Sequence, residues 1–200
     1  MIKVYLVEDQ GLVRGAVAAL LSLDISIEVV GQATNGHLAL QEIPQLHPDI
    51  VLTDIEMPVM TGIELAEQLS EHHPEIKVVI MTTFSRAGYI RRSMTAGVKG
   101  FVLKEAPSES LVAALKKVMA GQKVIDSELA LNALADSDPL SAKERKALQL
   151  AGEGLKTADI AARLYLSEGT VRNYLSDAIA KLNAINRVDA ARIAKQKGWL

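Results

Sequence analysis

The feature that most constrains the fold is an alternation, repeated five times over residues 1–121, between a short apolar segment and a longer segment with helical spacing. The apolar segments read KVYLVED, IEVVGQA, DIVLTD, KVVIMTT and KGFVLK. They are rich in β-branched residues and show little polar alternation, as strands buried on both faces of a parallel sheet do. Connections between parallel strands are right-handed. We therefore predict an α/β fold with a doubly wound, five-stranded parallel sheet covered by helices on both faces.

The pattern weakens after Gly121, and the chain becomes rich in turn-forming residues. Residues 122–138 end in ADSD, just before Pro139, and we interpret them as a linker. Residues 139–200 have helical spacing throughout, with candidate helix caps at Ser141, Thr157 and Ser167. The short LYLS connection between the two middle helices has the length of a helix-turn-helix. We therefore predict a second, all-α domain over residues 139–200.

Several classes of protein are excluded by the composition. The chain has no cysteine, which excludes disulfides, a thiolate nucleophile and a cysteine-based metal site. No apolar run approaches the roughly 18 residues of a membrane span. The first predicted strand meets an acid at Glu8, too early for a signal peptide. We expect a cytoplasmic protein without direct membrane insertion.

Charge is distributed unevenly between the two predicted domains. Residues 1–121 carry 10 Lys and Arg against 14 Asp and Glu, whereas residues 140–200 carry 11 against 6. An acidic first domain and a basic second one favour a polyanion as partner of the second. An excess of this size is also common on an ordinary solvated surface, so the charge indicates such a partner only weakly.

Polar side chains stand where four of the five predicted strands end. Glu8 and Asp9 close the first strand, Asp54 the third, Thr82 the fourth and Lys104 the fifth. The carboxyl ends of parallel strands lie at one edge of the sheet, where functional groups collect. Any one of these residues alone would be interpreted as a helix cap or a solvated loop residue. Together they predict a site.

Three carboxylates at one sheet edge imply a cation. Like charges raise one another's pKa, so the three cannot all ionise at close range without a counterion, and oxygen ligands favour Mg²⁺. We predict that Asp9 and Asp54 bind Mg²⁺ directly, that Glu8 binds it through water, and that Asp54 is the nucleophile of an aspartyl phosphate. Lys104 and the Thr82 hydroxyl would then bind phosphoryl oxygens, in a site that works by positioning and electrostatics.

Four motifs at these positions resemble those of bacterial two-component receiver domains: VEDQ, TDIEMPVMTG, MTTF and AGVKGFVLK. The resemblance implies a flavodoxin-like fold, phosphorylation of Asp54 by a sensor histidine kinase of the membrane-bound kind, and a Mg²⁺ ligand from the backbone carbonyl of Glu56. It also implies that Phe101 rotates inward when the threonine of the fourth strand moves toward the phosphoryl group. Many receivers have Pro directly after the lysine, but Lys104 is followed by Glu105, so a cis-proline at this loop is not implied.

Two other functions remain open. Phosphatases of the haloacid dehalogenase type also form an aspartyl phosphate, but their nucleophile follows the first strand, whereas Asp54 follows the third. A constitutive DNA-binding protein with an inactive receiver is the second alternative, and the complete set of Thr82, Lys104 and three acids argues against it. We expect no enzymatic activity beyond acceptance and slow loss of a phosphoryl group on Asp54.

The predicted helix that begins at Ser167 has a polar face near its start, formed by Thr170, Arg172, Asn173 and Ser176. Helix N-termini suit phosphates, and Arg and Asn read guanine and adenine edges. An amphipathic helix with an ordinary solvated face would show the same pattern, so chemistry alone leaves the DNA-binding interpretation open.

Residues 140–191 resemble the LuxR-type DNA-binding domain. A receiver followed by this domain is the arrangement of the NarL/FixJ class of response regulators, which implies binding to double-stranded DNA and control of transcription. By position, the resemblance implies residues that face bases, namely Arg172, Asn173 and Ser176. It also implies residues that lie nearer phosphates, namely Lys156, Thr170 and Lys181.

The first predicted helix, GLVRGAVAALLSL, is apolar over more of its circumference than one core-facing stripe requires. Its excess, with Val112 and Met119 of the fifth predicted helix, predicts a self-complementary patch for a homodimer. The alternative is that these residues only cover the sheet. A single helix-turn-helix reads few base pairs, so dimers bind paired half-sites, and we expect phosphorylation to promote the dimer.

Overall fold

The computed structural model describes residues 1–83, 87–125 and 138–200. These residues divide into two compact units: most of residues 1–125 belong to an α/β unit, and residues 138–200 belong to a helical unit. The larger part of the predicted linker, residues 126–137, lies outside the described residues. Within the described ranges, the helices are too short or too polar to cross a bilayer.

A six-stranded sheet with the order β2-β1-β3-β4-β5-β6 forms the centre of the α/β unit, and every neighbouring pair is parallel. The strands are β1 (Ile2–Val7), β2 (Ile27–Ala33), β3 (Ile50–Thr53), β4 (Lys77–Thr82), β5 (Gly100–Leu103) and β6 (Val124–Ile125). The predicted fold class and its five strands are confirmed. The additional strand, β6, has two residues and pairs with the open edge of β5. A two-residue strand has no periodicity, which is why the sequence did not indicate it.

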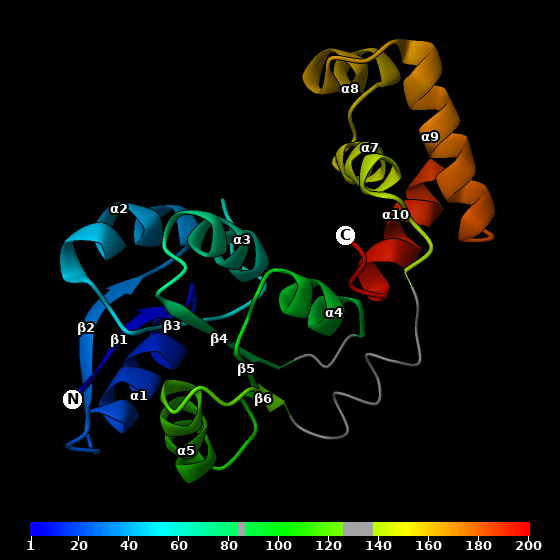
Figure 1. Ribbon diagram of the computed structural model, residues 1–200. Coiled ribbons are helices and arrows are strands. Elements are labelled where there is room, and N and C mark those ends of the chain that lie inside the picture. The colour runs from blue at the N-terminus through cyan, green and yellow to red at the C-terminus, as the bar shows by residue number, and fades with distance from the viewer. Residues whose placement is uncertain (84–86, 126–137) are drawn as a thin grey trace. The chain divides into compact units, whose positions relative to one another are not determined.

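Helices cover both faces of this sheet (Figure 1). On one face lie α1 (Gly11–Leu21) and α5 (Ser108–Met119); on the other lie α2 (Gly36–Leu46), α3 (Gly62–His72) and α4 (Ala87–Thr95). The central strands are buried on both sides: the four residues from Val4 to Val7 have no exposed surface. This explains why β1 is a continuous apolar run without polar alternation.

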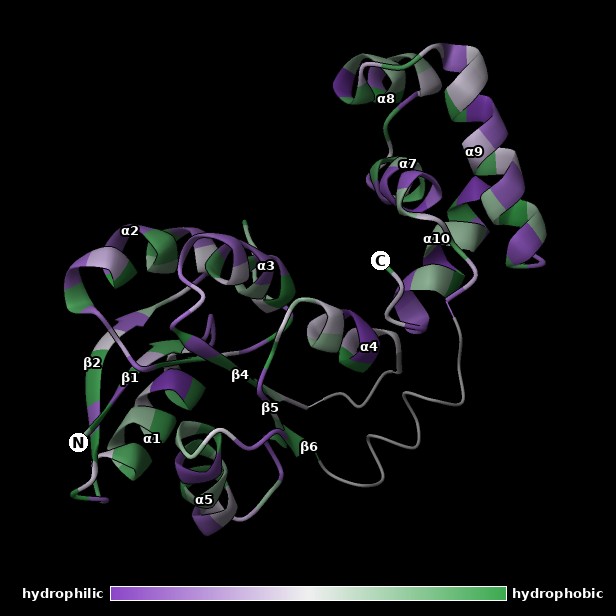
Figure 2. Ribbon diagram, in the orientation of Figure 1, coloured by the Kyte–Doolittle hydropathy of each residue, from purple (hydrophilic) through white to green (hydrophobic). Residues whose placement is uncertain are grey.

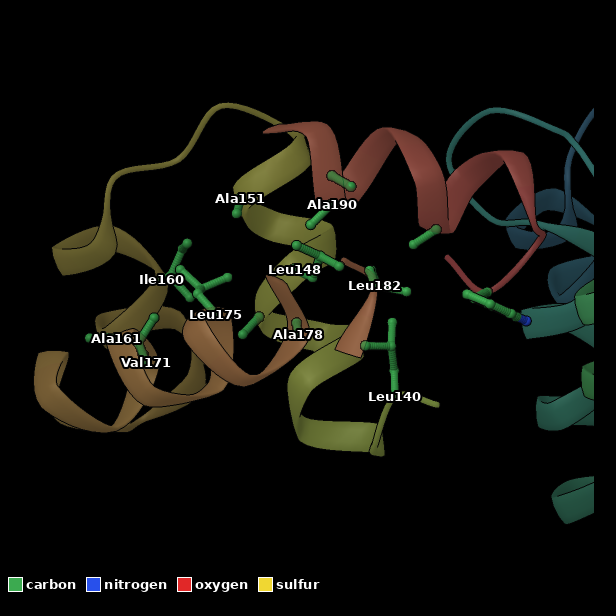
Figure 3. Close-up of a cluster of buried hydrophobic side chains, with 14 residues drawn as sticks. Leu140, Leu148, Ala151, Ile160, Ala161, Val171, Leu175, Ala178, Leu182 and Ala190 are labelled. Carbon is green, nitrogen blue, oxygen red and sulfur yellow. The ribbon is translucent and has the colours of Figure 1, made fainter. Parts of the chain in front are cut away.

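The helical unit contains α7 (Ala142–Gly152), α8 (Thr157–Leu164), α9 (Glu168–Lys181) and α10 (Arg187–Gln196). Buried side chains from all four helices form one core, which includes Leu148, Ile160, Leu175 and Ala190 (Figure 3). In the hydropathy colouring, hydrophilic and hydrophobic segments alternate along α9, as expected for a helix with one buried face (Figure 2).

Two of the three predicted helix caps are confirmed. The Ser141 side chain accepts a hydrogen bond from the Glu144 backbone, and Ser167 accepts one from Thr170, so α7 and α9 begin where predicted. The predicted cap at Thr157 is wrong: Thr157 is the first helical residue of α8, and the N-cap is Lys156, whose side chain makes no capping bond. Both residues can precede a helical pattern, and the sequence did not distinguish the cap from the first helical position.

Candidate functional site

The carboxyl ends of the central strands bring the predicted acidic residues together. In the parallel register, Val7 of β1 lies beside Thr53 of β3, so Glu8 and Asp54 each follow the last residue of neighbouring strands. The backbone N–H of Asp54 donates to the Val7 carbonyl at 3.0 Å, which extends this pairing by one residue. The two acids therefore leave the sheet at the same place.

Glu8, Asp9 and Asp54 form the cluster that the sequence predicted. One carboxylate oxygen from each lies within 4.8 Å of the others. Glu8 is fully buried and Asp54 is 6% exposed, whereas Asp9 is exposed. Two carboxylates at the floor of the cluster and one at the solvent side suit a ligand that arrives from water.

Lys104 reaches this cluster from the end of β5. Its ammonium lies 2.9 Å from Asp54 Oδ2 and 2.7 Å from Glu8 Oε2. The other oxygen of Asp54, Oδ1, accepts a hydrogen bond of 2.7 Å from the Ile55 backbone N–H. The Lys104 backbone N–H donates to the Thr82 carbonyl at 2.8 Å, which ties the end of β5 to the end of β4. The predicted position of Lys104 is confirmed.

The protonation of the cluster follows from burial opposed by Lys104. Burial raises the pKa of Glu8 and the pKa of Asp54, although the nearby ammonium of Lys104 acts in the opposite direction in both cases. Burial also works against the charge of Lys104, but its close contacts with the carboxylates of Glu8 and Asp54 outweigh burial and raise the pKa of Lys104. One ammonium is thus not enough to hold both buried carboxylates ionised at their usual pKa.

The donor set fits Mg²⁺. The contact between Lys104 and Glu8 Oε2 lacks hydrogen-bond geometry, so this buried oxygen has no hydrogen-bond donor among the residues that the structure describes. Such an oxygen beside two further carboxylates is a suitable acceptor for a hard divalent cation or its water. Asp9 and Asp54 would hold the ion, with Glu8 behind them, as the sequence predicted.

Two supporting residues were missed from the sequence. A Cβ atom at Gly62 would lie 1.9 Å from the Asp54 carbonyl oxygen, so only glycine allows α3 to begin this close to Asp54. Arg14 of α1 donates from Nη1 to the Glu8 carbonyl at 2.7 Å and holds the loop that carries the first two acids. The position of Gly62 directly after MPVMT could have indicated its role from the sequence. The position of Arg14 in an apolar helix gave no indication of its contact with the Glu8 carbonyl.

The remaining predicted residues of the α/β unit lie on the expected elements. Thr82 is the last residue of β4 and is 2% exposed, and Phe101 in β5 is 3% exposed. Glu56 is exposed in the loop that follows β3. Their roles in sensing the phosphoryl group and in donating a carbonyl to the metal stay predictions.

The predicted DNA-binding residues divide into two groups. Arg172, Asn173 and Ser176 are exposed together on α9, and Lys156 is exposed at the start of α8. Thr170 is partly buried, and its hydroxyl lies 2.8 Å from that of Ser167 at the helix cap. The exposed group is free of the domain core, as base-facing residues must be.

Lys181 has a partner within the helical unit. Its ammonium lies 2.8 Å and 2.7 Å from the two carboxylate oxygens of Glu144, which is 5% exposed. Breaking this pair would leave a buried carboxylate without its cation, which is costly. The pair links α9 to α7, and the contact of Lys181 with a DNA phosphate stays a prediction. The partner lies 37 residues away in the sequence, which is why the pattern within α9 did not reveal it.

Comparison with known proteins agrees with this arrangement. The family model of the response regulator receiver domain matches residues 4–116, and the model of bacterial regulatory proteins of the luxR family matches residues 138–194. The chain is a response regulator with a LuxR-type DNA-binding domain. This confirms the resemblance to the NarL/FixJ class that the motifs indicated.

Relatives of the same length support the assignment. The response regulator is 46% identical to the uncharacterized transcriptional regulatory protein YvfU of Bacillus subtilis over 200 residues, with both chains covered completely. It is 41% identical to the transcriptional regulatory protein DesR of the same organism over 199 residues, which cover 100% of this chain and 99% of DesR. Stretches such as DIEMP and TVRNYLS indicate the likeness to DesR from the sequence.

Solved structures agree as well. The response regulator ChrA, from a heme-sensing two-component system, is 33% identical and superposes with a TM-score of 0.59, covering 100% of this chain and 98% of ChrA. The likeness extends over both units, so the order of receiver and helix-turn-helix is shared along the whole chain.

Proposed function

We propose that this response regulator controls transcription by binding double-stranded DNA after a sensor histidine kinase phosphorylates Asp54. The observation that supports this most strongly is the Asp54 carboxylate, bound to Lys104 at 2.9 Å and adjacent to two further acids. A lone buried acid would have no need of such neighbours. A nucleophile that must accept a dianionic group does need them.

Phosphoryl transfer at this site needs little from the protein beyond position. A carboxylate oxygen of Asp54 attacks the phosphorus of a phosphohistidine, the P–N bond breaks, and its electron pair returns to the imidazole, which takes up a proton. Oδ1 is held by the Ile55 N–H, so the carboxylate cannot rotate freely. Bound Mg²⁺ would neutralise charge on the transferring oxygens.

Lys104 and Thr82 convert this chemistry into a signal. In the unphosphorylated site Lys104 is bound to Asp54 and Glu8; once Asp54 is phosphorylated, Lys104 can bind a phosphoryl oxygen instead. The Thr82 hydroxyl would bind another oxygen, and Phe101 would fill the space that it leaves. The phosphoryl group is then lost slowly by hydrolysis, without turnover of other substrates.

We propose that phosphorylation promotes a homodimer through α1 and α5. Within α1, Leu21 is the buried residue, whereas Leu12 is 88% exposed. Figure 2 shows α1 as a mainly hydrophobic helix. A groove of about 430 Å³ between α1 and α5 is lined by residues that include Leu20, Leu23 and Val112. Met119, which the sequence placed in the same patch, packs against the core and does not line the groove.

Charge complements the apolar part of this groove. Lys116 of α5 donates to Asp24 at 2.8 Å, and this hydrogen bond, with those from Ser26, lowers the pKa of Asp24 to about 2. The pair also lines the groove. A second copy of the chain would meet the same apolar and paired charged groups, as a twofold interface requires.

Dimerisation would provide the DNA specificity that one domain lacks. Two copies of α9 can read paired half-sites, with Arg172 and Asn173 facing bases and Lys156 near a phosphate. Each good base contact contributes about 1–3 kcal/mol of discrimination. We place phosphorylation and DNA binding in the cytoplasm, because the kinase domain and the DNA target both act in that compartment.

Uptake of a phosphoryl group tests the proposal directly. Acetyl phosphate with Mg²⁺ should add one acid-labile phosphoryl group, detected by intact-protein mass spectrometry, and Asp54→Ala should abolish the adduct. Glu67→Ala removes an exposed acid on α3 and serves as the matched control, which should label as the wild type does. Labelling of Asp54→Ala at the wild-type rate would show that another residue is the acceptor.

The dimer is tested separately. Multi-angle light scattering with beryllofluoride and Mg²⁺ should show a dimer for the wild type and a monomer for Ala19→Arg, which places a charge on the exposed face of α1. Gln68→Arg puts the same charge on the exposed face of α3 and should still dimerise. If both variants dimerise equally, the interface lies elsewhere.

A further inference from the structure

An acid stands at the start of the helix that we expect to read DNA. Glu168 is the first residue of α9 and is exposed. Its Oε2 atom lies 3.6 Å from Nη1 of Arg172, one turn further along, and the two side chains are 53% and 66% exposed. The residue expected to contact bases most strongly is therefore already paired with a carboxylate of its own helix.

A carboxylate on this surface is unfavourable for binding a polyanion. A negative charge near the N-terminus does stabilise a helix, but Ser167 already caps α9. The first-turn acids of two other helices are used differently: Glu144 closes a capping box and binds Lys181, and Asp189 accepts a hydrogen bond from the Ile185 backbone. Glu168 has no such backbone contact in the described residues, and its carboxylate lies against Arg172.

The pairing changes what Arg172 can bind. An unpaired guanidinium binds any phosphate oxygen within reach, which adds affinity for every DNA sequence. With Glu168 beside it, part of the guanidinium charge is compensated, and the carboxylate is repelled by phosphates. Guanine differs, because its N7 and O6 are neutral acceptors that take the remaining N–H donors of Arg172.

We propose that Glu168 is a positioning residue that sets the specificity of Arg172 by disfavouring its contact with phosphates. The carboxylate lowers binding to all DNA, but it lowers non-specific binding more than binding to a site with guanine at the correct position. Discrimination by rejection of the wrong partner is a general route to specificity. The inference rests on the proposed DNA-binding function of α9.

Glu168→Gln tests the proposal by fluorescence anisotropy with two duplexes. One is selected from a random pool by the beryllofluoride-bound wild type, and the other is a scrambled sequence of the same length. We expect affinity for the scrambled duplex to rise three- to tenfold, a smaller gain for the selected duplex, and a lower ratio of the two. The salt dependence for the scrambled duplex should steepen by about one phosphate contact, because Arg172 is released.

Three controls separate positioning from simpler effects. Asp177→Asn removes another exposed acid from α9, so it should raise both affinities equally and leave the ratio unchanged. Glu168→Asp keeps the charge at the helix N-terminus but shortens its reach, so the ratio should fall as in Glu168→Gln. In the Arg172→Ala background, Glu168→Gln should leave the ratio unchanged.

The outcomes are distinct. The proposal is overturned if Glu168→Gln and Asp177→Asn have the same effect, if Glu168→Asp behaves as the wild type, or if Glu168→Gln alters the ratio without Arg172. A wild type that selects no duplex from the pool, or an Arg172→Ala variant that discriminates as well as wild type, would instead overturn the proposed role of α9 in reading DNA.

Discussion

Two lysines in this protein are bound by buried carboxylates, and the two sites differ in how far the charge of each acid is compensated. Lys104 lies between Glu8 and Asp54, with a third acid nearby, and the pKa values of the two buried acids are raised. Lys181 binds both oxygens of Glu144. Burial alone would raise the pKa of Glu144, but the hydrogen bonds from Lys181 and Ser141 outweigh it and lower that pKa.

The difference lies in how fully each acid is satisfied. The Glu144 carboxylate accepts hydrogen bonds from Lys181 on both oxygens and from the Ser141 backbone N–H on Oε2, so its charge is stable and nothing further needs to bind. At the Asp54 site one ammonium serves two buried carboxylates, and a cation or a proton is still required. A buried cluster whose negative charges are not fully compensated by cations is therefore a better indication of function than an ion pair alone.

The largest effect is expected at Gly62. The Asp54 site, unlike the Lys181–Glu144 pair, depends on the close approach of two backbone segments. A methyl group in Gly62→Ala would overlap the Asp54 carbonyl, 1.9 Å from the position of the new Cβ. We expect the free energy of unfolding of the α/β unit to fall by about 2–3 kcal/mol, as for an overpacked core, with slower phosphorylation. Denaturant titration measures the loss. Gly15→Ala on α1, where a Cβ meets nothing within 4 Å, should not reproduce it.

Removing the lysine of the complete pair should be the next largest effect. Lys181→Met leaves Glu144 buried without its cation, and because Lys181 itself is 40% exposed we expect a loss of about 1–3 kcal/mol in the helical unit at pH 7. Thermal unfolding followed by circular dichroism measures it. If the lysine were instead a phosphate contact, stability would be unchanged and DNA affinity would fall at every sequence.

Removing a charge from the incomplete cluster should have the opposite sign. Asp54→Asn keeps the shape of the side chain but removes a carboxylate whose ionisation burial opposes. In EDTA we expect the α/β unit to gain stability, because the buried charge is removed. Adding Mg²⁺ should stabilise the wild type and not the variant. A destabilised Asp54→Asn protein in EDTA would show that the cluster is already balanced.

The smallest effect is a pair of opposite pH dependences. Because the pKa values of Glu8 and Asp54 are raised, the folded α/β unit binds more protons than the unfolded chain. Without Mg²⁺, its free energy of unfolding therefore falls as the pH rises through the pKa values of the folded state. The slope is at most about 1.4 kcal/mol per pH unit for each proton. The lowered pKa of Glu144 acts oppositely: its contribution is present above the unfolded pKa and is lost as pH falls. Unfolding each unit from pH 3 to pH 8 in EDTA checks both trends. Parallel trends would contradict the comparison.

The sequence predicted residues best where one element carries the signal. Asp9, Asp54 and Lys104 could be placed because strand ends at one sheet edge must meet, and Arg172 because helical spacing exposes it. The sequence did not reveal partners that come from a distant element. Glu144, the partner of Lys181, lies on another helix, and the glycine after MPVMT does not show by itself how closely Gly62 approaches the Asp54 carbonyl.

By itself, the sequence determined the order of strands and helices, the class of each domain and the place of Asp54 among the acids at the sheet edge, because periodicity and strand-end chemistry are local and repeat along the chain. Only the tertiary structure decided which charges are satisfied. It pairs Lys181 with Glu144 and Glu168 with Arg172. It leaves Glu8 Oε2 without a hydrogen-bond donor in the described residues. The physical reason is that the energy of a charge depends on its burial and on its nearest partners, and both are set by packing between elements that the sequence keeps apart.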